Sequence, residues 1–96
     1  MPTLDSLRSR RSEIIAAASL HGAHNVRVFG SVVRGDDTPE SDIDLLVDFD
    51  PERSLFDLVG LQLEIESLLG RRTDVVTERS LSAYLRDRIL AEARPL

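Results

Sequence analysis

The sequence predicts a mixed α/β (α+β) fold with the order α-β-α-β-α-β-α, in which helices flank a small three-stranded mixed sheet. Three observations indicate this fold. Apolar residues recur at helical spacing in some stretches, they alternate with polar residues as in strands in others, and glycine, proline and polar clusters separate the stretches. We therefore expect a single domain over residues 1–96.

The size and composition of the chain favour a small soluble protein. It has 96 residues, enough for one hydrophobic core, and 42% of them are hydrophobic. The sequence contains no run of 18 apolar residues and does not begin like a signal peptide, so we expect a cytoplasmic protein without membrane contact. Because it has no cysteine, disulfides and thiolate metal sites are excluded.

The charge balance is acidic, with a formal net charge of −5 and no lysine. Binding to nucleic acid regardless of sequence requires clustered cations, so we expect no direct nucleic-acid contact. The acidity is compatible with docking onto a basic protein, and also with the ordinary solubility of an acidic surface.

Helical and strand-like stretches follow one another along the chain. We expect helices over 4–20, in a short turn after Ser31, over 55–69 and from Ser80 onward, and strands over 25–29, 42–49 and 71–77. Ser54 and Asp57 form a capping box before the third helix, and Gly70 ends it. The apolar stripe of this helix predicts core packing, whereas Phe56 and Leu63 lie off the stripe and could contact a partner.

Asp42 and Asp44 are the first candidates for chemistry. They alternate with apolar Ile43 and Leu45 and therefore point to one face of a strand, with Cα atoms roughly 6.5 Å apart. A divalent cation between the two carboxylates would relieve their repulsion, and hard oxygen ligands favour Mg²⁺ or Mn²⁺ over zinc. Asp48 would point to the same face of the strand, but it lies roughly 13 Å beyond Asp44, which is too far for it to share that ion.

Gly30 and Ser31 suggest a phosphate site. A glycine directly after a strand lets backbone amides approach an anion, and the serine hydroxyl adds a donor. Arg34 returns to the same side of a helical turn, where it could bind phosphate oxygens or pair with Asp36 or Asp37. Phosphates beside a carboxylate-held cation describe a nucleotide site, and the missing lysine excludes a Walker loop.

A third carboxylate follows from the expected topology. A strand, a helix and a second strand form a right-handed crossover within one sheet. This crossover would bring Asp74 beside Asp42 and Asp44. The alternative role for Asp74 is a strand-edge residue that forms an ion pair with Arg71 or Arg72.

These residues resemble a known signature. Gly30-Ser31, ten residues and Asp42-x-Asp44 are similar to the motif of the DNA polymerase beta-like nucleotidyltransferases. The fuller pattern Phe-Gly-Ser-x-x-Arg-Gly, six residues, Asp-Ile-Asp-Leu-Leu-Val resembles the minimal nucleotidyltransferase (MNT) branch, small antitoxins encoded beside HEPN-domain toxins. The motif covers about a fifth of the chain, and the order of elements extends the resemblance over nearly all of it.

The resemblance implies a nucleotidyltransferase fold, a set of roles and a partner. Asp42, Asp44 and Asp74 would be catalytic and would hold up to two Mg²⁺ ions, with Asp74 accepting the proton of the attacking hydroxyl. The nucleotide-binding residues would be Gly30, Ser31 and Arg34. ATP would be the AMP donor and a tyrosine of a cognate HEPN toxin the acceptor, within a hetero-oligomer of the two proteins.

Two other functions remain open at this point. A non-catalytic antitoxin could neutralise the toxin by binding and occlusion while it keeps a nucleotide pocket as a relic. Transfer to a small molecule is less favoured, because a chain of 96 residues has little room for a lobe that binds the acceptor.

Overall fold

The computed structural model describes residues 2–96 and confirms the mixed α/β class. Its helices are α1 (Pro2–Ser9), α2 (Arg11–Leu20), α3 (Ser31–Arg34), α4 (Leu55–Leu69) and α5 (Ala83–Glu92), with a 3-10 helix η1 (Glu78–Ser80) before α5. The strands are β1 (Ala23–Phe29), β2 (Ile43–Phe49), β3 (Thr73–Thr77) and β4 (Arg94–Pro95). Within the described range, every helix is too short or too polar to cross a bilayer.

The sheet has four strands, in the order β3-β2-β1-β4, instead of the three that were predicted. The crossover through α4 places β3 parallel to β2 as expected, while β1 runs antiparallel to both β2 and β4. The added strand has two residues, one of them a proline, which fits an edge position. A segment this short has no alternation that a sequence pattern could reveal.

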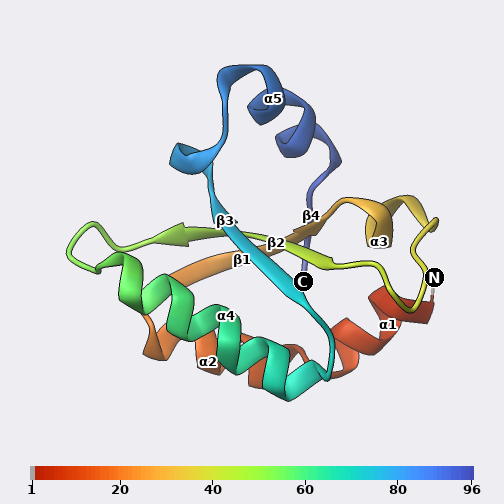
Figure 1. Ribbon diagram of the computed structural model, residues 1–96, viewed down its shortest axis with the longest axis horizontal. Helices are drawn as coiled ribbons and strands as arrows, with labels where there is room; N and C mark the ends of the chain where they lie inside the picture. The colour runs from red at the N-terminus through yellow and green to blue at the C-terminus, as the bar shows by residue number, and fades with distance from the viewer. Residues whose placement is uncertain (1) are drawn as a thin grey trace.

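Helices α1, α2 and α4 cover one face of the sheet, whereas α5 stands on the opposite side (Figure 1). Ile43, Leu45 and Val47 of β2 point toward the covered face and are at most 1% exposed. Their neighbours Asp44 and Asp48 point to the other face, as the alternation predicts. We call this second face the site face.

The predicted first helix is two helices. The chain bends at Arg10, whose backbone has φ −109° and ψ 17°, so that α1 and α2 follow each other with different axes. The bend allows Leu4 and Leu7 of α1 to be buried together with Ile14 of α2. A helical apolar pattern continues through the break and therefore does not reveal it.

Helix α4 begins and ends as predicted. Ser54 and Asp57 form the capping box, with the Ser54 N–H donating to the Asp57 carboxylate at 3.1 Å, and Gly70 ends the helix at φ 67°. Phe56 and Leu63 are 87% and 59% exposed, in agreement with their place off the buried stripe.

The last helix begins later than Ser80. That residue ends η1, and Ser82 caps α5 by accepting the Leu85 N–H at 3.3 Å. No residue of α5 is buried, so this helix is connected to the body mainly through its two ends.

Candidate active site

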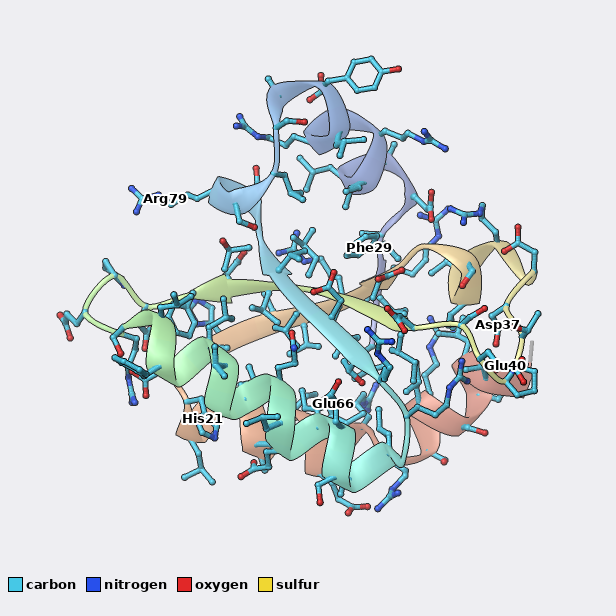
Figure 2. The ribbon with its side chains drawn as sticks, viewed as in Figure 1. His21, Phe29, Asp37, Glu40, Glu66 and Arg79 are labelled. Atoms are coloured by element: carbon cyan, nitrogen blue, oxygen red, sulfur yellow. The ribbon has the colours of Figure 1, made fainter. Side chains whose placement is uncertain are left out.

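Asp44 and Asp74 are neighbours on the site face. The parallel register of β2 and β3 pairs Asp44 with Asp74, and the antiparallel register of β1 and β2 pairs Asp44 with Phe29. Figure 2 shows Phe29 on the side of the sheet that faces α5. The structure thus brings together two of the three predicted carboxylates, which come from strands 30 positions apart in the chain.

Asp42 lies just before β2 and is close to an arginine. Its carboxylate is 3.7 Å from Nε of Arg72, on an exposed part of the surface. Among residues 2–96 no three histidine, cysteine, aspartate or glutamate side chains are arranged to hold a metal ion. Asp44 and Asp74 are thus paired by the register of the strands, and Asp42 lies close enough for its charge to raise the pKa of Asp44 while it also approaches Arg72.

Asp44 is the electrostatic centre of this face. Partial burial, followed by the negative charges of Asp74 and Asp42, raises the pKa of Asp44 from 3.8 to about 6. Glu92 adds to this rise, and Arg34 opposes it. A cation bound at Asp44 would reduce the repulsion among these carboxylates, so the site favours cation binding.

Gly30 lies directly against Asp44 at the end of β1. Its φ of 80° is in the left-handed region, and a Cβ at this position would overlap Oδ2 of Asp44. Both facts require glycine. The close approach leaves the Gly30 N–H at the site, where it can donate to an anion.

Ser31 begins α3, which is anchored by buried Val32. The Ser31 carbonyl accepts the N–H groups of Gly35 and Asp36 at 2.9 and 3.1 Å, which closes the turn. Within the described part of the chain its hydroxyl has no hydrogen-bond partner, so it is available to a ligand.

Arg34 and Glu92 form an ion pair beside this turn. Nη1 of Arg34 is 2.9 Å from Oε1 of Glu92, and Nε of Arg34 is 3.5 Å from Asp36. The same Glu92 oxygen accepts the Gly30 N–H at 2.6 Å. Arg34 is thus at the predicted nucleotide site, with two carboxylates as its present partners.

The sequence pattern did not identify Glu92 as a site residue. It places Glu92 on the outer side of the last helix, and only the fold of the C-terminal segment brings it back to the Gly30 turn. Its side chain is 19% exposed.

Arg71 holds the loop that leads to Asp42. Its side chain is only 23% exposed, and Nη2 donates to the carbonyls of Thr38 and Ser41 at 3.1 and 2.7 Å. Asp37 in the same loop accepts the Thr3 hydroxyl at 2.7 Å, which connects the loop to α1 (Figure 2).

Comparisons with known proteins agree with this arrangement. Residues 12–96 match the profile of a family described as a nucleotidyltransferase domain. The chain is 43% identical over 83 residues to MJ0435 of Methanocaldococcus jannaschii, a candidate protein adenylyltransferase, covering 86% of this chain and 89% of that protein.

Solved structures give the same result. One, described as a candidate minimal nucleotidyltransferase, is 49% identical with a TM-score of 0.87, covering 97% of this chain and 95% of the other. A toxin-antitoxin structure with AMP-PNP is 23% identical with a TM-score of 0.74, covering 88% of this chain and 69% of the other, and so shares the fold.

Proposed function

Because this chain belongs to the nucleotidyltransferase domain family, we propose that it transfers AMP from ATP to a tyrosine of a HEPN toxin and thereby acts as that toxin's antitoxin. The observation that carries the proposal is the register that sets Asp74 beside Asp44, against the Gly30 turn. The name of MJ0435 supports adenylyl transfer, and the toxin-antitoxin structure with AMP-PNP supports an ATP-binding antitoxin. A cytoplasmic location, where ATP is abundant, is part of the same proposal.

The phosphates of ATP would bind at the turn after β1. The Gly30 N–H and the Ser31 hydroxyl are donors there, and the Arg34 guanidinium adds positive charge that can contact two phosphate oxygens. Glycine at position 30 lets a phosphate approach the backbone as closely as the Asp44 carboxylate does now.

Asp42, Asp44 and Asp74 would hold Mg²⁺. Their oxygens are the hard donors that Mg²⁺ prefers, and the raised pKa of Asp44 reflects a concentration of negative charge that a divalent cation would offset. Asp42 is one of the carboxylates that raise this pKa, and its exposed contact with Arg72 at 3.7 Å is a weak one. When bound, Mg²⁺ would neutralise the phosphates and lower the pKa of the attacking hydroxyl.

The transfer itself needs one base. The tyrosine oxygen forms a bond to the α-phosphorus while the bond from that phosphorus to the bridging oxygen breaks, and pyrophosphate leaves. Asp74 is exposed beside Asp44 and would accept the tyrosine proton. The AMP left on the tyrosine adds negative charge to the toxin, which would disfavour RNA binding at a nearby nuclease site.

Occlusion without catalysis is a second candidate function. It is favoured by the ion pair of Glu92 and Arg34 beside the turn, because Glu92 occupies two of the donors that the ATP phosphates would need. In that case the chain would neutralise the toxin by binding alone.

Labelled ATP separates the two functions. The purified chain is incubated with Mg²⁺, ATP labelled on its α-phosphate and the HEPN-domain toxin proposed as its partner, and label on the HEPN protein is measured together with its ribonuclease activity. Catalysis predicts that Asp44→Asn and Asp74→Asn each lower labelling by about a hundredfold or more. Asp87→Asn is the matched control, because it removes the same charge from the exposed side of α5.

The ribonuclease measurement decides the outcome. If Asp44→Asn abolishes both labelling and neutralisation, catalysis is supported. If the wild-type chain neutralises the toxin without labelling it, and Asp44→Asn neutralises it equally well, occlusion is the function.

A further inference from the structure

A carboxylate of this chain lies where the proposed function places a phosphate. Oε1 of Glu92 accepts the Gly30 N–H at 2.6 Å and lies 2.9 Å from Nη1 of Arg34. The Gly30 N–H and the Arg34 guanidinium are two of the three groups that are proposed to bind the phosphates of ATP. A carboxylate oxygen and a phosphate oxygen make the same kind of charge-assisted hydrogen bond, so the two ligands compete for the same donors.

The backbone just after Glu92 is fixed to the body. Arg94 and Pro95 form β4 and pair with Val28 and Arg27 of β1. Leu96 is 6% exposed in the core, and its N–H donates to the Val26 carbonyl at 3.1 Å. Because the tether is only a few residues long, Glu92 is held close to Gly30 at a high effective concentration.

The segment before Glu92 is packed less tightly than the segment after it. None of the residues of α5 is buried, and the helix stands away from the sheet in Figure 1. Rotation of the last turn of α5 would move the Glu92 side chain off the Gly30 N–H without disturbing a packed core.

We propose that Glu92 is a built-in competitor of the ATP phosphates, so that nucleotide binds only when the end of α5 turns away. This inference rests on the proposed nucleotide site at Gly30, Ser31 and Arg34. The chain alternates between a closed form, in which Glu92 occupies the turn, and an open form that accepts a triphosphate. The apparent dissociation constant of ATP is then the intrinsic one divided by the fraction of open chain.

The test measures binding of AMP-PNP with Mg²⁺ by titration calorimetry to the wild type and three variants. Glu92→Gln keeps the length of the side chain and removes its charge, and Glu92→Ala removes both the charge and the acceptor. Glu78→Gln is the matched control, because it makes the same chemical change at an exposed position in η1. Thermal unfolding first shows that each variant is folded.

We expect Glu92→Gln to bind AMP-PNP about tenfold more tightly than the wild type, which corresponds to a closed form populated about nine times in ten. Glu92→Ala should bind at least as tightly as Glu92→Gln, and Glu78→Gln should stay within about twofold of the wild type. The Gly30 amide resonance should shift in Glu92→Gln, and also when AMP-PNP binds the wild type. A purely structural role for Glu92 would lower the unfolding temperature without tightening AMP-PNP binding.

The measurement distinguishes a failure of the competitor role from a failure of the proposed nucleotide site. If the wild type binds AMP-PNP and Glu92→Gln binds equally well or more weakly, the competitor role is wrong while the proposed function stands. If no variant binds AMP-PNP at millimolar concentration, the nucleotide site itself is wrong and the competitor role is overturned with it. Binding by Glu92→Gln but not by the wild type would support both.

Discussion

Asp44 carries an electrostatic strain that its neighbours impose. Its carboxylate is crowded by Asp74, Asp42 and Glu92, with one cation, Arg34, acting in the other direction. A protein selected for stability alone would gain by neutralising such a group. The strain is consistent with a residue kept for binding a cation.

This strain predicts how stability depends on pH. Partial burial and neighbouring carboxylates raise the pKa of Asp44 from 3.8 to about 6, so the folded chain binds a proton more tightly than the unfolded chain does. The stability that protonated Asp44 contributes is present below pH 3.8 and is lost as the pH rises through 6. Discounted for solvent screening, the ionised group costs about 1 kcal/mol at pH 7.5.

Asp44→Asn should therefore raise the free energy of unfolding by about 1 kcal/mol at pH 7.5 and change it much less at pH 4. Urea denaturation in EDTA measures both values. Added Mg²⁺ should stabilise the wild type at pH 7.5 and leave Asp44→Asn nearly unchanged. A variant less stable than the wild type at pH 7.5 in EDTA would contradict the account.

At the level of elements, the loop between α3 and β2 is positioned by a side chain that comes after α4. Arg71 donates to two carbonyls of this loop and lies 3.8 Å from the Asp37 carboxylate. The loop ends at Asp42, so Arg71 sets the entry of the chain into the site.

Arg71→Met should lower the free energy of unfolding by about 2 kcal/mol, since it leaves the Thr38 and Ser41 carbonyls without their charged donor. Hydrogen exchange of the amides in 36–41 should also become faster. Arg79→Met is the control, because Arg79 projects from η1 into solvent (Figure 2), and its effect should stay within about 0.5 kcal/mol. Equal effects of the two substitutions would show that the loop does not depend on Arg71.

On the scale of the whole molecule, the C-terminal segment completes both the sheet and the core. It pairs with β1, and Leu96 is buried in the core cluster that also contains Leu4, Ala23 and Val26. Residues from both ends of the described chain thus share one core.

Leu96→Ala should cost about 2 kcal/mol of unfolding free energy, because it leaves a cavity in this core. The matched substitution Leu90→Ala, at a residue that is 37% exposed on α5, should cost under about 1 kcal/mol. Chemical denaturation of both variants gives the comparison. If Leu96→Ala proves as mild as Leu90→Ala, the C-terminal segment does not contribute to the core as described.

The features that could be predicted from the amino-acid sequence are local. The alternation of Asp42 and Asp44 with apolar residues, the Gly30-Ser31 pair and the capping box of α4 depend on neighbours a few positions apart, so they predicted the fold class and the family. The roles of Asp42, Asp44, Asp74, Gly30, Ser31 and Arg34 stay predictions.

Contacts between distant parts of the chain could be seen only in the tertiary structure. The contact of Glu92 with Gly30 joins residues 62 positions apart, and that of Arg71 with Ser41 joins residues 30 apart. The fourth strand likewise exists only because β1 offers it an edge. The spacing of apolar residues cannot predict such contacts, because they depend on the packing of the whole chain and not on the conformational preferences of any one segment.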